Sequence, residues 1–343
     1  MSNKSTRKHC SVVIIVLNYK GIEDTKDAIA SLIAQHYDGV RIIAVENGSE
    51  DNSVHEFKKL EQQYGRSLVT IYNDKNLGFA GGANTGIRWA IENDFEYIAL
   101  FNNDAVGDVN WLQNLLNASR AKDIGITTGL LLNSKGNKID STGEQYSIWG
   151  LPFPRNRGDS TVSAPKNELV FGATGGATLY KTALFQDIGL FDEDFFAYYE
   201  DVDISFRAQL AGWKVAYTPQ AVAYHKQGAT SQKIPGFTVY QTFKNLPLLF
   251  EKNIPKGLLF SVGIRFYFAY TMMFLNAIKH GAGVPASKGL LKSMVLKFPA
   301  LAKRRAIQRN KRVSTDYIKS ILWPDLPPDQ TGLRKLRRFF TGK

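Results

Sequence analysis

The sequence predicts an α/β fold: a mostly parallel sheet flanked by helices, followed by a basic α-helical C-terminal appendage. Apolar runs of strand length and segments with helical spacing alternate through the first 130 residues. The strand-like runs are apolar on both faces, which is typical of parallel strands that helices cover on both sides. With 343 residues, 44% of them apolar, the chain can bury one large domain in addition to the appendage.

The first part of the chain predicts four strands separated by three helices. Strands are expected where the apolar runs are continuous, at residues 11–18, 41–46, 68–72 and 97–101. Helices are expected where apolar residues recur at helical spacing, at residues 24–35, 53–64 and 78–93. Residues 133–168 are rich in Gly, Pro, Ser, Asn and Lys and predict a long excursion, after which residues 169–180 and a helix from Glu200 return to the core.

Polar side chains lie at the carboxyl ends of two predicted strands. Glu46 and Asn47 follow one strand, and Asn102, Asn103 and Asp104 follow another. Ligands of α/β proteins bind outside the carboxyl edge of the sheet, and Mg²⁺ or Mn²⁺ takes carboxylate and phosphate oxygens. These residues therefore indicate a site for a nucleotide diphosphate and a divalent cation, in which Glu46 accepts the imide N–H of uracil or thymine. The alternative is a pair of polar turns, which Asn and Asp favour.

Three further motifs point to the same kind of site. Residues 76–86 form a Gly-rich loop that runs into a helix, and small residues let backbone N–H groups approach phosphates, although alone this is a weak signal. Glu200 and Asp201 open a helix beside aromatic residues, which favours a desolvated and more basic carboxylate; alternatively, they only stabilise the helix start. His225 follows a short apolar strand and suits Mn²⁺, although a lone His is usually not a ligand.

The order and spacing of these motifs closely resemble inverting glycosyltransferases of family 2, which have the GT-A fold. The resemblance covers roughly residues 11–230 and is nearest to the rhamnosyltransferase-like branch. That branch pairs a loop of the type NLGFAGGANTGI with NND and with YYEDVDISFRAQLAGW, as this chain does.

This resemblance implies a role for each motif residue. It implies that the donor is bound by Asn18, Glu46, Asn47, Gly78, Phe79, Asn84, Asn103 and Asp104. It implies that the acceptor side is lined by Gly175, Gly176, Tyr199 and Glu200. It implies that Asp201 is the catalytic base, and that Asp104 and His225 hold Mg²⁺ or Mn²⁺. Two residues depart from the family pattern: Glu46 stands where Asp is usual, and Asn102 stands where a strict DxD motif has its first Asp.

The C-terminal part of the chain carries the positive charge. Residues 251–343 hold 19 Lys and Arg against four acidic residues, whereas the chain as a whole has a net charge of +12. Residues 257–278 are largely apolar and, at ~1.5 Å per residue, just long enough to cross a bilayer core. Residues 290–307 are basic and amphipathic, which favours a helix lying on an anionic membrane surface. A spanning helix and a buried helical hairpin that completes the domain are the alternatives.

Together these observations predict a GT-A glycosyltransferase domain at residues 1–235 and a membrane-associating region at residues 236–343. The expected enzyme transfers a sugar from a nucleotide-diphosphate donor to a lipid-linked saccharide acceptor in cell-surface polysaccharide synthesis. It would act at the cytoplasmic face of the plasma membrane, as a peripheral or monotopic protein. From the resemblance, dTDP-rhamnose is the first donor to consider, and a UDP-sugar is the alternative. The lone Cys10 excludes an intrachain disulfide and favours a reducing compartment.

Two rival functions remain open at this point. A nucleotidyltransferase would share the nucleotide fold and the metal, but it usually carries a basic Gly-rich loop in its first strand-to-helix turn. Residues 18–21 of this chain, Asn-Tyr-Lys-Gly, are too poor in Gly and Arg for that loop. The basic C-terminal part would also suit a nucleic-acid-binding protein, but its apolar spacing fits a bilayer better, so no nucleic-acid partner is expected.

Overall fold

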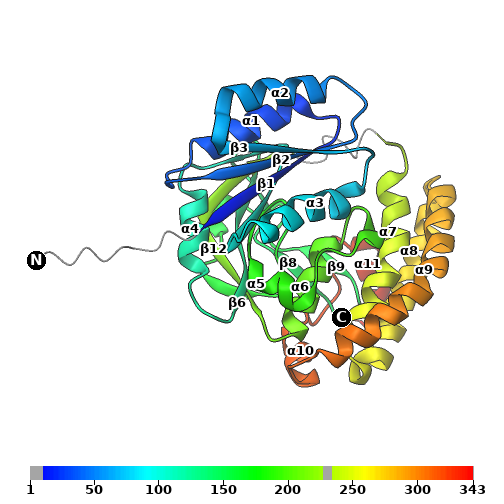
Figure 1. Cartoon of the computed structure of the whole chain (residues 1–343). Coiled ribbons are helices and arrows are strands. Elements are labelled where there is room, and N and C mark those ends of the chain that lie inside the picture. The colour runs from blue at the N-terminus through cyan, green and yellow to red at the C-terminus, as the bar shows by residue number, and fades with distance from the viewer. Residues whose placement is uncertain (1–10, 227–233, 343) are drawn as a thin grey trace, which may run out of the picture.

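A computed structural model describes residues 11–226 and 234–342 of the chain (Figure 1); Cys10 lies outside the described residues. The strands are β1 (Val12–Asn18), β2 (Arg41–Asn47), β3 (Leu68–Asn73), β4 (Tyr97–Asn102), β5 (Ala105–Gly107), β6 (Ile124–Asn133), β7 (Ile139–Ser141), β8 (Glu144–Tyr146), β9 (Pro152–Pro154), β10 (Glu168–Val170), β11 (Ala177–Lys181) and β12 (Lys214–His225). The α-helices are α1 (Ile22–Ile33), α2 (Ser53–Tyr64), α3 (Gly78–Glu92), α4 (Trp111–Ala118), α5 (Thr182–Ile188), α6 (Glu200–Leu210), α7 (Phe237–Asn253), α8 (Leu259–Lys279), α9 (Gly283–Arg309), α10 (Thr315–Ile321) and α11 (Thr331–Thr341).

One large sheet organises the first two thirds of the chain. Its strand order is β10-β12-β6-β11-β4-β1-β2-β3, with β5 added beside β12 and β7 beside β6. The four strands β3, β2, β1 and β4 are parallel, as are β6 and β12, whereas β11 runs antiparallel between β4 and β6. The parallel part directs the carboxyl ends of β1, β2 and β4 to one edge of the sheet. This architecture confirms the predicted α/β fold.

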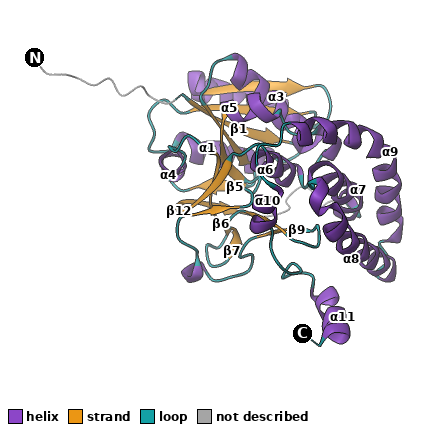
Figure 2. Cartoon of the chain, turned by 90° about the horizontal axis from the view of Figure 1, so that it is seen from below, coloured by secondary structure: helices purple, strands orange, loops and turns teal. Residues whose placement is uncertain are grey.

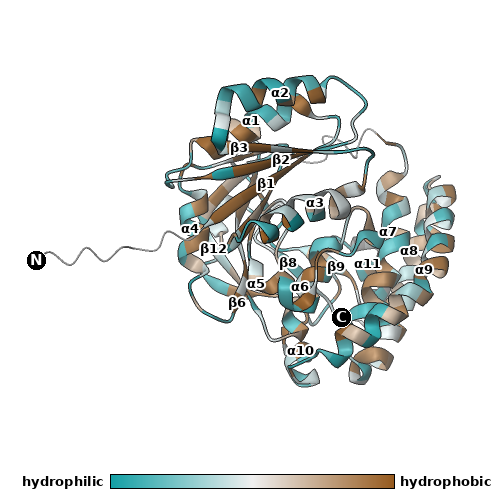
Figure 3. Ribbon diagram, viewed as in Figure 1, coloured by the Kyte–Doolittle hydropathy of each residue, from teal (hydrophilic) through white to brown (hydrophobic). Residues whose placement is uncertain are grey.

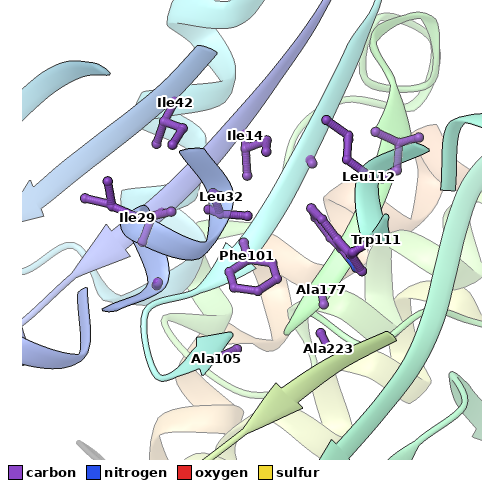
Figure 4. Packing of buried hydrophobic residues seen from close by; sticks show 14 of the residues in the cluster. Ile14, Ile29, Leu32, Ile42, Phe101, Ala105, Trp111, Leu112, Ala177 and Ala223 are labelled. Carbon is purple, nitrogen blue, oxygen red and sulfur yellow. The ribbon is translucent and has the colours of Figure 1, made fainter. Parts of the chain in front are cut away.

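Helices cover both faces of the sheet, so its strands are buried on both sides. In β1, Ile14 belongs to the apolar cluster under α1, α2 and α4. The next residue, Ile15, points to the other face and belongs to the cluster under α3, α5 and α6. Figure 4 shows the first cluster, in which Leu32 of α1 and Trp111 of α4 lie on either side of Phe101. Figure 3 shows β1 and β2 as hydrophobic along most of their length, as two-sided burial requires.

The predicted elements agree with the structure most closely in the parallel part of the sheet. The predicted helix at residues 53–64 coincides with α2, and the four predicted strands match β1 to β4 within one residue at each end. The central strand β6 was not predicted. The excursion at residues 133–168 contains β7, which pairs with β6, and the two-stranded sheet of β8 and β9. The short strand predicted before His225 is β12, which ends at His225 and is irregular between Thr218 and Val222.

The C-terminal helices share a third apolar cluster with the helix that carries Asp201. Val202 and Phe206 of α6 lie in this cluster with Phe250 of α7 and Phe266 of α8. The rings of Phe250 and Phe266 stack with their centroids 4.7 Å apart. Figure 2 shows α7, α8 and α9 gathered on one side of the sheet. Segment Lys256–Lys279 is the one described helix that is long and apolar enough to cross a membrane, with a third of its most apolar stretch buried in the protein.

Buried ion pairs join the same helices. Lys252 of α7 is 2% exposed, and its Nζ lies 2.8 Å from Asp203 Oδ1 of α6 and 2.5 Å from Asp192 Oδ2. Arg207 of α6 binds the other oxygen of Asp203 at 2.9 Å. Lys303 of α9 reaches Asp192 Oδ1 at 2.5 Å. A buried carboxylate needs such partners, so α7 supplies a counter-charge to α6, and α7 and α9 together supply one to Asp192 in the segment before α6.

Candidate active site

The carboxyl ends of three neighbouring strands bring the predicted donor residues together. Asn18 at the end of β1 is the register partner of Glu46 on β2, and the preceding residue, Leu17, is the partner of Asn102 on β4. Asn103 follows β4, and its Nδ2 lies 3.2 Å from Thr25 Oγ1 at the start of α1. The residues therefore converge because parallel strands end at one edge of a sheet.

On the β1–β2 side, the polar groups hold the two strand-end turns. The Oδ1 of Asn18 accepts hydrogen bonds from Thr25 Oγ1 at 2.9 Å and from the backbone N–H of Gly21 at 3.3 Å. Glu46 is 3% exposed, and its two carboxylate oxygens accept the backbone N–H groups of Gly48 and Ser49 at 3.0 and 2.9 Å. Each carboxylate oxygen has a further lone pair, so this arrangement leaves acceptor capacity for a base.

Asn47 fixes the Gly-rich loop against β2 and β3. Its Nδ2 donates to Asn76 Oδ1 and to the carbonyl of Gly78, both at 3.1 Å, and its Oδ1 accepts from Asn73 Nδ2 at 3.0 Å. Gly78 has φ +71°, and a Cβ there would lie 2.3 Å from the carbonyl oxygen of Phe196. Only glycine fits this position, which joins the loop to the segment that precedes α6.

Helix α3 lies unusually close to the sheet and to the segment before α6. A Cβ at Gly82 would meet Leu17 at 2.4 Å, so its glycine is explained by helix packing. Asn84 is 1% exposed, and its Nδ2 donates to the carbonyl of Phe191 and to Glu193 Oε1, both at 2.9 Å. These bonds use both amide hydrogens of Asn84, so its Nδ2 holds residues 191–193, and its predicted contact with the donor stays a prediction.

His225 lies between two carboxylates at the end of β4. Its Nε2 is 3.0 Å from Asp104 Oδ1, and its Nδ1 is 2.7 Å from Asp140 Oδ2. Strand β5 pairs with the end of β12, with Ala105 opposite His225, which sets this geometry. Asn102 Nδ2 lies 3.3 Å from the same Nε2. Burial disfavours the imidazolium, but the two carboxylates outweigh it and raise the pKa of His225 to about 9.

The pair Asp104 and His225 fits the donor set of a divalent cation. Both side chains are largely buried, at 9% and 14% exposure. Neighbouring ligands of one Mg²⁺ at ~2.1 Å lie ~3 Å apart, which is the separation that the two atoms already have. Within residues 11–226 and 234–342, no group of three or more His, Cys, Asp or Glu side chains is arranged to hold a metal ion. A cation here would therefore take its other ligands from phosphate oxygens and water.

Asp201 lies in a different environment, at the start of α6. Its Oδ2 accepts the backbone N–H of Gly175 and its Oδ1 that of Val202, both at 2.8 Å. Burial raises the pKa of Asp201, and these N–H groups and the charge of Arg157 only partly offset it. The preceding residues Tyr198 and Tyr199 have φ of 69° and 71°, a conformation that non-glycine residues rarely adopt and that is common at functional sites.

Gly175 and Gly176 connect the two parts of the site. Gly175 donates to Asp201, and the carbonyl of Gly176 accepts the backbone N–H of Asn102 at 2.8 Å. A Cβ at Gly175 would lie 3.5 Å from Asp201 Oδ2 and 3.6 Å from Phe79 Cζ. The ring of Phe79 therefore lies close to Asp201, and the two glycines link Asp201 to Asn102 at the end of β4.

Two further carboxyl groups lie close to Asp201. Glu200 is 6% exposed, and its Oε2 has no hydrogen-bond partner among the described residues. Burial and the neighbouring Asp201 raise the pKa of Glu200 to about 8. Glu144 of β8 is 8% exposed, and burial with the Asp201 charge holds its pKa well above the usual range. Tyr199, on the same side, donates to or accepts from Thr242 Oγ1 at 3.3 Å.

Sequence reasoning missed three residues of this neighbourhood. Asp140, Glu144 and Arg157 all come from the excursion at residues 133–168, which its composition marks only as irregular. Asp140 is 2% exposed and binds both His225 and Arg157. The one local signal was the apolar Ile139 before Asp140, a pattern too short to distinguish a buried strand from a loop.

A profile of glycosyl transferase family 2 matches residues 11–189, more than half of the chain. The low-salt glycan biosynthesis hexosyltransferase Agl10 of Haloferax volcanii is 24% identical over 253 residues, which cover 71% of this chain and 78% of that protein. The poly-β-1,6-N-acetyl-D-glucosamine synthase of Staphylococcus aureus is 23% identical over 216 residues, 62% of this chain and 49% of the synthase.

Solved structures show the same fold. The mannosyltransferase PcManGT of Pyrobaculum calidifontis, in complex with GDP-Man and Mn²⁺, superposes with a TM-score of 0.54 over 91% of this chain and 83% of its own. The two sequences are 14% identical, so the likeness concerns the fold alone. The family profile, the fold and the strand-end site agree, and the chain belongs to glycosyl transferase family 2 as a glycosyltransferase with the GT-A fold.

Proposed function

We propose that the enzyme transfers a sugar, with inversion, from a nucleotide-diphosphate donor to a saccharide hydroxyl. The observation that carries the proposal is the joint position of Asp201 and of the pair Asp104 and His225. The two lie at one sheet edge and are joined through Gly175 and Gly176, which bind Asp201 and Asn102. A proton acceptor and a group that holds the donor diphosphate are the two parts that an inverting transfer needs.

Asp201 is suited to act as the base. It would take the proton of the acceptor hydroxyl, and that oxygen would attack the anomeric carbon from the face opposite the diphosphate. The carboxylate is fixed by two backbone N–H groups, which leaves one lone pair on each oxygen for the acceptor. Because burial raises its pKa, Asp201 is a stronger base than an exposed aspartate.

Asp104 and His225 would hold Mg²⁺ or Mn²⁺ on the donor diphosphate. When bound, the cation supplies positive charge against the charge that develops on the leaving diphosphate. The related fold of PcManGT binds GDP-Man with Mn²⁺, which supports a metal in this chain too. Asn103 and Asn102 would orient the surrounding loop, since both amides already contact α1 or His225.

For the donor we propose dTDP-rhamnose first and a UDP-sugar second. The sequence resemblance to the rhamnosyltransferase-like branch supports rhamnose, and the buried carboxylate of Glu46 supports a base with an imide N–H. The hexosyltransferase name of the Haloferax relative supports transfer of a six-carbon sugar. A screen for donor hydrolysis over dTDP-, UDP- and GDP-sugars tests this choice. Hydrolysis of UDP-sugars alone would refute rhamnose, and hydrolysis of GDP-sugars alone would also refute the recognition of uracil or thymine by Glu46.

We further propose that the acceptor is lipid-linked and that the chain lies on the cytoplasmic surface of an anionic membrane. The outer faces of α8 and α9 expose large apolar side chains, namely Phe260, Ile264, Tyr267, Phe268, Leu275, Ile278, Val284, Leu291, Met294, Val295, Phe298 and Leu301. On α9 the exposed Lys288 and Lys292 lie on one side of this stripe and Lys297 on the other. An apolar stripe flanked by lysines fits an interfacial helix, and α8 keeps its other face in the protein core.

Binding to vesicles tests the membrane proposal. The double variant Leu291→Asp and Phe298→Asp should lose binding to anionic vesicles at least tenfold, because burying such side chains in lipid contributes roughly 1.5–3 kcal/mol each. Val162→Asp is the matched control, because Val162 is 94% exposed and lies in the excursion, outside this surface. Equal binding by the wild type, the double variant and the control would refute membrane binding through this surface. Release of the wild type by alkaline carbonate would support a peripheral attachment, and retention a deeper one.

A further inference from the structure

A row of four side chains runs from the protein surface to the end of β4. Arg157 Nη2 lies 3.0 Å from Asp140 Oδ1, Asp140 Oδ2 lies 2.7 Å from His225 Nδ1, and His225 Nε2 lies 3.0 Å from Asp104 Oδ1. The exposure of these side chains falls from 57% at Arg157 to 1% at Asp140. The first two residues come from the excursion at residues 133–168 and the last two from β12 and the turn after β4.

We propose that Asp140 is a positioning residue of the metal site, which acts through His225 and is itself fixed by Arg157. The proposal rests on the proposed function, because it assumes that Asp104 and His225 hold the cation. It assigns to the excursion a part in donor binding that neither the family profile nor the sequence motifs indicate.

The geometry of the imidazole carries the first step. A histidine binds a metal through one ring nitrogen, and the hydrogen bond of the other nitrogen sets which one is free. Asp140 Oδ2 accepts the Nδ1–H of His225, so Nε2 is the nitrogen turned toward Asp104. A carboxylate in this outer position also makes the ligand nitrogen a better electron donor. Asp140 thus fixes both the orientation of the ring and the identity of its ligand atom.

Arg157 holds Asp140 in place through both its side chain and its backbone. Arg157 Nη2 binds the Asp140 carboxylate, and its Nε donates to the carbonyl oxygen of the same residue at 3.1 Å. Next to Asp140, the backbone N–H of Ile139 donates to the backbone carbonyl oxygen of Asp159, and the N–H of Gly158 donates to that of Ile139, both at 2.9 Å. A buried carboxylate is costly without compensation, and here two partners and a paired backbone keep it in place.

A purely structural role for Asp140 makes a different prediction. In that case Asp140 would only neutralise the buried His225, and its loss would lower the free energy of unfolding without a specific change in metal affinity. A positioning role requires that metal affinity fall while the affinity for metal-free nucleotide stays the same. The two roles therefore differ in a directly measured dissociation constant.

The experiment is a titration of the full chain with Mn²⁺, followed by the electron paramagnetic resonance signal of free Mn²⁺, in the presence of dTDP and separately of UDP. Asp140→Asn should weaken Mn²⁺ binding by ~10–100-fold, the usual effect of losing an outer-shell partner. Arg157→Gln should give a smaller loss in the same direction. Asp159→Asn is the matched control: it makes the same chemical change on the same excursion, at an exposed side chain that accepts a hydrogen bond from Asn156 Nδ2 at 3.2 Å. This control should bind Mn²⁺ like the wild type.

Binding of dTDP without metal, measured by calorimetry, shows that each variant keeps its nucleotide site. Unchanged Mn²⁺ affinity in Asp140→Asn would overturn the positioning role, as would an equal loss in the Asp159→Asn control. If the Asp140→Asn protein unfolds, Arg157→Gln decides alone, because it leaves the Asp140–His225 pair present. If the wild type binds no Mn²⁺ with either nucleotide, the metal assignment fails and the positioning role with it; sugar transfer that depends on Asp201 would still support the proposed reaction.

Discussion

Asp104 and Asp201 are carboxylates of one site in opposite surroundings. Asp104 lies against an imidazole, 3.0 Å from its Nε2, and the pair is buried at a sheet edge. Asp201 is held by two backbone N–H groups at 2.8 Å and has the carboxyl groups of Glu144 and Glu200 for neighbours. One aspartate thus lies beside a partner that can carry positive charge, and the other lies near two further carboxyl groups.

This difference separates two tasks that one residue type can perform. A carboxylate that binds a metal must be ionised, and a nearby positive charge favours the ionised form. A general base must attract a proton, and burial among other carboxyl groups raises its pKa and so its basicity. Burial raises the pKa of Asp201, which suits it to the second task. Substitutions on each side of the site should therefore have different signatures.

The largest effect is expected for Asp201→Asn. The amide keeps the shape of the side chain but cannot take a proton, so sugar transfer should fall by ~10²–10⁴-fold. The affinities for nucleotide and for Mn²⁺ should stay as in the wild type, because Asp201 is held by Gly175 and Val202, whereas Asp104 and His225 hold each other. Transfer rates from radiolabelled donor, together with calorimetry, measure both. Near-normal transfer would assign the base to another carboxylate, with Glu200 the first to examine.

Asp104→Asn should produce the complementary signature. Loss of the charge should weaken Mn²⁺ binding by ~100-fold or more, beyond the ~10–100-fold of an outer-shell change, and should weaken donor binding with it. Activity of the wild type should disappear in excess EDTA and return with Mn²⁺ or Mg²⁺. His225→Ala should cost more with Mn²⁺ than with Mg²⁺, since imidazole is the softer ligand. Full activity in EDTA would separate the Asp104–His225 pair from the reaction.

Glu46→Gln extends the comparison to a third carboxylate, one held by two backbone N–H groups as Asp201 is. A charge-assisted hydrogen bond to the base would be lost, which corresponds to about 1.5–3 kcal/mol in nucleotide affinity. The rate at saturating donor should change little. Dissociation constants for dTDP and UDP measure the effect. A lower rate with unchanged affinity would mean that Glu46 does not read the base.

The smallest effect is expected for Glu200→Gln, and it is one on stability. In the folded protein the pKa of Glu200 is about 8, above its usual value. Between the ordinary carboxyl pKa and pH 8 the folded state keeps a proton that the unfolded state has lost, so the wild type loses stability as the pH rises through this range. The variant lacks this loss, so its gain in melting temperature should grow from pH 5 to pH 8. Glu92→Gln, at the exposed end of α3, is the control and should show no such trend.

The parallel half of the fold could be predicted because its signals are local. Continuous apolar runs and helical spacing fix β1 to β4 and α2, and parallel strands then bring Asn18, Glu46 and Asp104 to one edge. The family resemblance added Asp201 and His225. In each case the position of the residue follows from the element that it ends or begins.

The residues that were missed depend on pairings between distant segments. Asp140 reaches His225 because β7 pairs with β6 and β6 pairs with β12, and no local pattern encodes either register. Glu144 approaches Asp201 through its backbone pairing with Gly172, 28 positions along the chain. Asn84 also makes contacts that its loop did not predict, because its helical position brings the amide to Phe191 and Glu193, more than 100 positions along the chain.

The buried ion pairs between α6 and the C-terminal helices have a practical consequence for protein engineering. Lys252 of α7 neutralises Asp203, which lies two positions after Asp201. A truncation before α7 would remove this cation and expose the apolar side chains of α6, so the helix that carries Asp201 would lose part of its support. To obtain an enzyme that can be purified without detergent, replacing the exposed Leu291 and Phe298 by polar residues is therefore a better route than shortening the chain.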